Sequence, residues 1–229
     1  METGQFLVER TVPGLHDFLI SEVLPGYLRP GAQACDLGAG SGALARRLQD
    51  LGANVIACDR TLPEDPPTAF VEVDLDRPGF GRQIGVRDFD LITGIEVIEH
   101  LESPMNFLRE LAGLLAPTGI ALLTTPNMDS LPARLRFALR GKLRMFDGWG
   151  DPTHISPIFR HLLLEKYLPR AELEALEILT YPLTGFIAGR SIYKALLRPA
   201  APLLARFAVA GDCMVMILRL VPHGRRPPS

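Results

Sequence analysis

The 229-residue chain has little cysteine, and its three thiols follow no metal-binding or redox spacing. Cys35, Cys58 and Cys213 each stand inside an apolar run. That placement is typical of buried, reduced thiols, because free cysteine behaves as a small hydrophobic side chain. We therefore expect neither a zinc site nor a redox centre built on these residues.

Long hydrophobic runs and a secretory leader are also lacking. Charged or polar residues interrupt every apolar stretch before it reaches about 18 residues, the length that a membrane-spanning helix needs. The amino terminus, METGQFLVER, lacks the basic region followed by an apolar region that marks a signal sequence. We therefore expect a soluble, cytoplasmic protein.

The chain has no strong charge of one sign. Its 24 Lys and Arg residues nearly balance 26 Asp and Glu residues, and the net charge of −2 argues against general nucleic-acid binding. Half of the cations, however, lie within residues 134–144 and 190–226, which together hold one acid, Asp212. No internal repeat or low-complexity block is present. The length predicts a single domain over residues 1–221, followed by a polar, disordered tail over residues 222–229.

What the sequence does contain is an alternation of strand-like and helix-like segments. Residues 42–52 and 103–117 carry apolar side chains at helical spacing, and Ser-Pro pairs at Ser103 and Ser156 predict helix starts. The predicted strands are residues 32–37, 53–59, 69–74, 89–95, 119–125, 175–181 and 213–220. This order predicts an α/β, Rossmann-like, doubly wound sheet with ligands at the carboxyl ends of its strands.

The stretch DLGAGSG follows the first predicted strand and begins with Asp36. Its glycines would let a ligand approach the backbone N–H groups without meeting a Cβ atom: Gly38, Gly40 and Gly42. Asp59 ends the second strand, where a carboxylate can accept both hydroxyls of a ribose, and Asp74 ends the third. Three acids at successive strand ends suit a cationic nucleoside that carries amines better than one that carries phosphates.

The motifs ACDLGAGSGALARRL, NVIACD, VEVDLD and FDLITGIEVIEHLESP together resemble those of class I S-adenosylmethionine-dependent methyltransferases, from about Pro25 to Asn127. The resemblance implies S-adenosyl-L-methionine as the cofactor and a seven-stranded sheet whose last strand is antiparallel. It places Asp36 near the methionine end, the three glycines beneath the ligand, Asp59 at the ribose and Asp74 at the adenine amine. It also implies that Leu75 and Glu96 contact the cofactor.

Two other classes of protein stay open at this point. The stretch GAGSGA fits the looser dinucleotide pattern, so an NAD-dependent oxidoreductase is one alternative, although Asp36 stands where dinucleotide folds usually carry an apolar residue. A non-catalytic protein that binds S-adenosylmethionine is the other, because a fold and a cofactor loop do not prove turnover.

The stretch EVIEHLESP resembles the fourth-strand region of the ubiquinone-pathway O-methyltransferases. It also resembles small-RNA 2′-O-methyltransferases, in which such glutamates and histidines bind a metal; the matching residues here are Glu96, Glu99, His100 and His154. The sequence around the last of these, DPTHISPIF, lacks the aromatic, charge-rich continuation of the RNA enzymes. We therefore predict that no metal is bound and that Glu99 and His100 shape the cofactor pocket. A metal-dependent RNA 2′-O-methyltransferase stays open as the alternative.

Two basic, amphipathic segments, at about residues 128–155 and 185–210, are predicted to form lids over the acceptor entrance. They favour a small-molecule or lipid-like acceptor and peripheral contact with an anionic membrane, whereas nucleic acid is not expected because aromatic residues do not interleave the cations. Transfer to an oxygen atom, the predicted reaction, requires a base. His154, on a loop before a predicted helix, is the first candidate, and His100 is the second.

Overall fold

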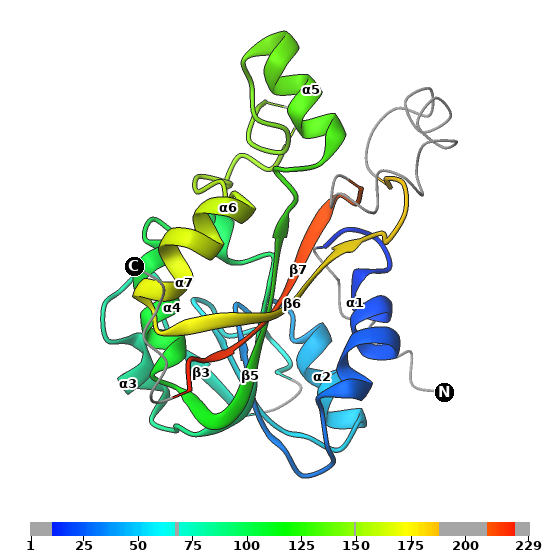
Figure 1. Ribbon diagram of the computed structural model, residues 1–229. Helices are drawn as coiled ribbons and strands as arrows, with labels where there is room; N and C mark the ends of the chain where they lie inside the picture. Colours follow the sequence, from blue (N-terminus) through cyan, green and yellow to red (C-terminus); the bar gives the residue numbers. More distant parts are fainter. Residues whose placement is uncertain (1–10, 67–68, 149, 188–209, 223–229) are drawn as a thin grey trace.

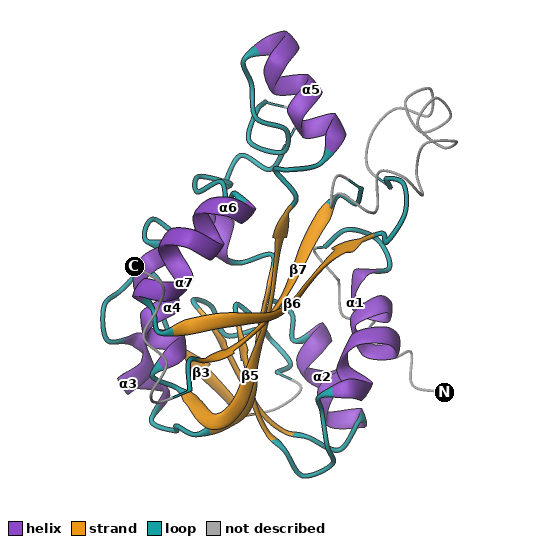
Figure 2. Cartoon of the chain, viewed as in Figure 1, coloured by secondary structure: helices purple, strands orange, loops and turns teal. Residues whose placement is uncertain are grey.

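The computed structural model describes residues 11–66, 69–148, 150–187 and 210–222. Seven strands form one sheet (Figure 2): β1 Gln33–Leu37, β2 Asn54–Asp59, β3 Ala69–Glu72, β4 Phe89–Ile95, β5 Leu115–Pro126, β6 Leu173–Tyr181 and β7 Cys213–Leu220. The strand order is β3-β2-β1-β4-β5-β7-β6, and β7 runs antiparallel to both β5 and β6 while the other neighbours are parallel. The predicted doubly wound sheet with an antiparallel last strand is confirmed.

Helices cover both faces of the sheet (Figure 1). One face carries α1 Leu15–Phe18, the helical turns η1 Leu19–Val23 and η2 Leu24–Gly26, and α2 Ala43–Asp50. The other face carries α3 Phe80–Ile84, η3 Ile98–His100, α4 Pro104–Ala112, α6 Arg160–Leu162, η4 Leu163–Tyr167 and α7 Leu168–Arg170. The remaining helix, α5 Leu131–Arg140, stands away from the sheet beyond the end of β5.

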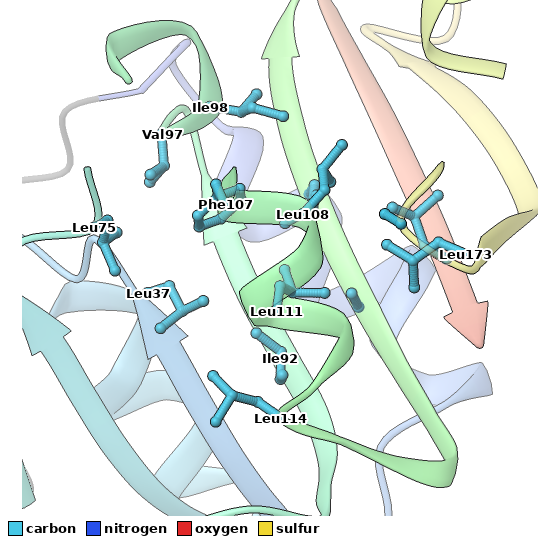
Figure 3. Packing of buried hydrophobic residues seen from close by; sticks show 14 of the residues in the cluster. Leu37, Leu75, Ile92, Val97, Ile98, Phe107, Leu108, Leu111, Leu114 and Leu173 are labelled. Carbon is cyan, nitrogen blue, oxygen red and sulfur yellow. The ribbon is translucent and has the colours of Figure 1, made fainter. Parts of the chain in front are cut away.

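Two hydrophobic cores lie on the opposite faces of the sheet. Phe107, Leu108 and Leu111 of α4 pack over β1 and β4 in the first core (Figure 3). Leu15 of α1 and Leu44 of α2 belong to the second core, on the opposite face of the sheet. Successive side chains of a strand point to opposite faces. On β1 this alternation sends Cys35 and Leu37 to the α4 face and directs Asp36 to the face that α1 and α2 cover.

The three cysteines are buried and free, as predicted. Cys35 and Cys58 lie side by side on β1 and β2, where their thiols form a hydrogen bond with the sulfur atoms 3.8 Å apart and no disulfide. They fill the core beneath the glycine loop and take no part in a metal or redox cluster in the described chain.

Some predicted element boundaries were wrong. The helix expected over residues 103–117 does begin after Ser103, whose hydroxyl accepts a hydrogen bond from the Asn106 N–H at 3.3 Å, but it ends at Ala112 because Leu115 already begins β5. The Ser156 hydroxyl caps no helix and instead donates to the Leu101 carbonyl at 2.6 Å. The chain stays non-helical until α6 begins at Arg160.

The first predicted lid, residues 128–155, consists of α5 and a loop that returns to the body. Ion pairs anchor this segment: Arg136 to Asp147 within it, and Arg144 to Asp212 of the body at 2.7 Å. The second predicted lid, residues 185–210, and the predicted tail, residues 222–229, lie almost entirely outside the described residues. Among the described helices, none is long and apolar enough to cross a membrane.

Candidate cofactor and acceptor site

A cleft of about 480 Å³ opens at the carboxyl ends of β1, β2 and β4. Its volume lies within the range of about 300–1,000 Å³ that is usual for small-ligand sites. The strand order reverses between β1 and β4, and ligands bind at such switch points in open α/β sheets. The predicted site residues that line it are Asp36, Gly38, Gly40, Asp59, Leu75, Glu96 and His100. Gly42, Asp74 and His154 do not line it.

Asp36 is a buried carboxylate at the floor of this cleft. Its Oδ1 accepts a hydrogen bond from the Thr93 hydroxyl at 2.6 Å, whereas no described residue donates to Oδ2 with standard hydrogen-bond geometry. Burial raises the pKa of Asp36 to about 7, and the nearby Asp59 charge adds to this, although the Thr93 hydroxyl and the Ala45 backbone N–H oppose it. An unpaired carboxylate oxygen that faces a cleft suits a cationic or amine-bearing ligand, so Asp36 fits the expected cofactor.

The glycine loop keeps its backbone close to the ligand space. Gly38 has φ +75°, and a Cβ atom there would lie 2.4 Å from a methyl group of Val97. At Gly40, which has φ +55°, a Cβ atom would meet no protein atom within 4 Å and would project into open space. Gly42, with φ +79°, precedes the first residue of α2. Gly38 therefore allows the loop to pack on Val97, whereas Gly40 leaves room for a ligand.

Asp59 joins the glycine loop to the end of β2. Its Oδ2 accepts a hydrogen bond from the Gly40 N–H at 2.7 Å, and its Oδ1 accepts one from the Arg60 N–H at 2.6 Å. Each carboxylate oxygen can accept a further bond, because each has two lone pairs. The side chain can thus hold the loop and still receive two ribose hydroxyls.

Asp74 lies at the rim, not in the wall of the cleft. Its carboxylate pairs with Arg60 at 2.9 Å and with Arg77 at 3.5 Å. Arg60 also pairs with Asp76, so this guanidinium bridges the ends of β2 and β3. The next residue, Leu75, is buried and supplies apolar surface to the cleft.

Glu96 adopts a left-handed backbone conformation, with φ +54°, at the end of β4. Its Oε1 accepts hydrogen bonds from the Thr124 hydroxyl at 3.1 Å and from the Cys213 thiol at 3.2 Å. Burial raises the pKa of its carboxyl group above the usual value. The side chain is thus engaged with β5 and β7 and is not part of the cluster formed by the next glutamate.

Glu99, His100 and His154 come together at one edge of the cleft. One possible ligand atom from each lies within 4.8 Å of the other two. Glu99 is fully buried (0% exposed), and no described residue donates to its carboxylate oxygens with standard hydrogen-bond geometry, although its own N–H and the Thr125 hydroxyl lie near enough to lower its pKa. Burial, reinforced by the nearby Glu96 charge, raises the pKa of Glu99 well above its usual value. Of the four ligands that the resemblance implied, the structure assembles three and leaves Glu96 outside.

Hydrogen bonds orient both imidazole rings of this cluster. The Nδ1 atom of His154 lies 2.9 Å from the Met145 carbonyl oxygen, so Nδ1 must carry the proton. The Thr153 hydroxyl donates to Asp151 at 2.5 Å, and its oxygen therefore accepts from Nδ1 of His100 at 2.8 Å. The rings pack edge to face with centroids 4.6 Å apart. With Nδ1 as the donor in each ring, Nε2 is the nitrogen that can accept a proton or bind a cation.

Several residues that line the cleft carry no clear signal in the sequence. His16 is buried on α1 and lines the cleft, but α1 is too short to show a helical period. Asp151 and Thr153 also line it. Their proximity to His154 in the stretch DPTH was the available signal, but only the folded chain reveals that they orient His100.

Burial, followed by the influence of His100, lowers the pKa of His154 below its usual value.

Comparison with known proteins identifies the family. The family described as a methyltransferase domain matches residues 13–178. A ubiquinone biosynthesis O-methyltransferase from Caulobacter sp. (strain K31) is 34% identical over 105 residues, which are 42% of this chain and 42% of that protein. The similarity to this relative thus spans less than half of its length.

Solved structures agree with the fold. A S-adenosylmethionine-dependent methyltransferase from Archaeoglobus fulgidus has a TM-score of 0.56 and 15% identity, with 89% of this chain and 93% of that chain covered. The 1,6-didemethyltoxoflavin-N1-methyltransferase of Burkholderia thailandensis, solved with S-adenosylhomocysteine, has a TM-score of 0.58 and 17% identity, with 91% and 79% covered. With its seven-stranded sheet and its family match over residues 13–178, this chain belongs to the class I S-adenosylmethionine-dependent methyltransferases, whose methyl donor is S-adenosyl-L-methionine.

Proposed function

We propose that this chain transfers the methyl group of S-adenosylmethionine to an oxygen atom of a small-molecule, sugar or lipid-like acceptor. The observation that carries the proposal is the unpaired Oδ2 atom of Asp36, buried at the floor of the cleft. A dinucleotide would bring phosphates toward this carboxylate and be repelled, whereas S-adenosylmethionine brings two positively charged groups, its α-ammonium and its sulfonium. This argues against the NAD-dependent alternative.

Different residues of the cleft would bind different parts of the cofactor. Asp36 would receive the methionine amino group, Asp59 the ribose hydroxyls, and Leu75 would pack against the base. Asp74, already paired with two arginines, would reach the adenine amine with its remaining lone pairs. Gly40 would let the ligand lie on the loop, because no Cβ atom occupies that space.

Methyl transfer to oxygen is an in-line displacement. The acceptor oxygen forms the new bond to carbon, the bond between carbon and sulfur breaks, and the sulfonium becomes a neutral thioether. Alignment of the two reactants supplies much of the rate, and a base must take the hydroxyl proton. We assign proton acceptance to the pair His100 and His154, since His100 lines the cleft and His154 lies directly behind it.

A second candidate, metal-assisted methyl transfer, is favoured by the Glu99 carboxylate. Both of its buried oxygens lack a described partner beside two imidazoles whose Nε2 atoms are available. This mixed oxygen and nitrogen set suits a divalent cation. Asp151, through Thr153, and the Met145 carbonyl hold the rings as outer partners of metal-bound histidines do. A cation there would supply positive charge next to the acceptor oxygen, in contrast to the metal-free site that the sequence predicts.

Two measurements test these proposals. Mass spectrometry of extract fractions incubated with the protein and S-adenosylmethionine should detect a compound that gains one methyl group on oxygen. Saturable cofactor binding with no methylated product would favour the non-catalytic alternative, and tight binding of NAD would contradict the assignment. Calorimetric titration of the EDTA-treated protein with Mn²⁺, with Glu99→Gln as the variant and Glu102→Gln as the control, decides whether the cluster binds a cation.

A further inference from the structure

The helix α5 presents its apolar side away from the protein. Leu135 and Leu139 are 47% and 81% exposed, whereas Ala133 is buried, at 4%. Phe137, on the same side of the helix as Ala133, is 56% exposed. At 3.6 residues per turn, the residues on the side opposite Ala133 form one apolar stripe: Leu131, Leu135, Ala138 and Leu139. A helix that packs on a core buries such a stripe. In Figure 1, α5 instead stands clear of the sheet.

Cations accompany this exposed stripe. Residues 130–146 contain five basic residues and no acid: Arg134, Arg136, Arg140, Lys142 and Arg144. Three of them pair with acids: Arg134 with Asp129, Arg136 with Asp147 and Arg144 with Asp212. The other two, Arg140 and Lys142, are exposed and form no ion pair within the four described ranges. They follow Leu139, the most exposed large apolar side chain of α5.

We propose that α5 docks this protein on an anionic phospholipid surface. The stripe defined above would enter the boundary between headgroups and acyl chains, and Arg140 and Lys142 would contact lipid phosphates. A helix with an exposed apolar stripe, with cations on its polar face and at its end, has the pattern of a helix that lies in a membrane interface. Anionic headgroups attract Lys and Arg near the surface, and salt weakens this attraction.

Charge complementarity favours lipid over two other occupants. Residues 188–209 of this chain lie outside the described ranges and contain four cations and no acid, so they cannot neutralise Arg140 and Lys142. A second copy of the protein, packed α5 against α5, would bring the same cations together. An anionic membrane supplies both the apolar phase and the missing negative charge.

The surface lies next to the proposed site. Helix α5 follows the carboxyl end of β5, and the loop after it carries Met145, whose carbonyl binds His154 beside His100 of the cleft. A docked α5 would therefore hold this edge of the cleft near the bilayer, where an amphiphilic acceptor would be concentrated. This last step rests on the proposed function, whereas docking itself does not.

Vesicle co-sedimentation tests the docking without cofactor or acceptor. The full chain should bind vesicles of phosphatidylcholine with phosphatidylglycerol, bind pure phosphatidylcholine vesicles weakly, and lose binding at high salt. The partition coefficient should fall about fivefold for each cation removed in Arg140→Gln and Lys142→Gln. Leu139→Gln, which retains the charge, should also weaken binding. Exposed residues elsewhere supply matched controls, Arg87→Gln and Leu176→Gln, which should bind normally.

Three outcomes would overturn the proposal. Equal binding to neutral and anionic vesicles would remove the role of charge. Normal binding by the Leu139→Gln and Lys142→Gln variants would remove the role of α5. Concentration-dependent self-association that Leu139→Gln abolishes, without vesicle binding, would assign the surface to a second copy. Unchanged far-UV circular dichroism and melting temperature of each variant exclude misfolding as the cause, and a chain without methyltransferase activity would still give the same vesicle result.

Discussion

Thr93 donates a hydrogen bond to Asp36 across neighbouring strands, with 2.6 Å between the hydroxyl and carboxylate oxygens. The two residues are register partners on β4 and β1. The bond holds one carboxylate oxygen on the sheet and leaves the other unpaired at the floor of the cleft. Burial raises the pKa of Asp36 to about 7 despite the Thr93 hydrogen bond, so the charge of Asp36 changes with pH near neutrality.

Cofactor affinity should rise with pH through the pKa of Asp36. That pKa is raised to about 7, chiefly by burial, and the α-ammonium group of S-adenosylmethionine should bind the ionised form. One unit below such a pKa about one tenth of the carboxyl groups are ionised, so affinity should rise about tenfold between about pH 6 and about pH 8. Isothermal titration calorimetry measures this, and Asp36→Asn should bind weakly with no such rise. A flat profile for the unmodified protein would contradict the role of Asp36.

The same carboxylate should destabilise the cofactor-free protein at alkaline pH. Its pKa is about 7 in the folded chain. It would be about 3.9 in the unfolded chain, so the folded state binds more protons between these values. The contribution of Asp36 to stability is therefore present below about pH 4 and is lost as pH rises to about 7. Asp36→Asn should increase the free energy of unfolding relative to the unmodified protein at about pH 8 but not at about pH 4. Urea denaturation at both values checks this, and an equal effect at both would refute it.

Two glycines of the loop should respond differently to alanine. Gly38→Ala adds a Cβ atom 2.4 Å from Val97 and forces alanine to φ +75°. We expect losses of about 1–2 kcal/mol from the backbone and about 1–3 kcal/mol from overpacking. Gly40→Ala meets no protein atom, so it should lose only the backbone amount yet impair cofactor binding. Denaturation and calorimetry measure the two effects, and Val97→Ala should partly restore the stability of Gly38→Ala.

Asp59→Ala should weaken both S-adenosylmethionine and S-adenosylhomocysteine, because both carry the ribose. Loss of hydrogen bonds to a charged acceptor costs about 1.5–3 kcal/mol, or about tenfold to a hundredfold in affinity. The variant also releases the Gly40 N–H, so Asp59→Asn, which keeps one carbonyl acceptor, should bind with intermediate affinity. Unchanged affinity in Asp59→Ala would show that the ribose lies elsewhere.

His154→Ala and His154→Gln test the histidine pair. If the pair accepts the acceptor proton, kcat should fall by about 10²-fold or more in both variants, while cofactor affinity is retained. His161→Gln, on α6, serves as the control because His161 does not line the cleft. Near-normal turnover in His154→Gln would mean that His154 has only a structural role between Met145 and His100. His100→Gln would then be the variant to measure.

The site was only partly predictable from sequence. The carboxyl ends of neighbouring parallel strands meet at one edge of the sheet. Local sequence patterns were therefore enough to predict which side chains of those ends line the cleft: Asp36, Gly38, Gly40, Asp59 and Leu75. The prediction that no metal binds depended on the residues that follow His154 in the sequence. The orientation of the His100 ring, by contrast, depends on contacts with Thr153 and Asp151 that no spacing rule reveals.

The sequence by itself determined the fold class and the cofactor loop, because strand period, helix period and glycine positions are local properties of the chain. Only the tertiary structure decided the outcome for individual side chains. Glu96 accepts hydrogen bonds from Thr124 and Cys213 of distant strands, and Asp74 pairs with arginines at the rim. The apolar stripe of α5 lies outside the core. Each of these depends on which partner is close in space, and contacts between residues far apart in sequence exist only once the sheet has assembled.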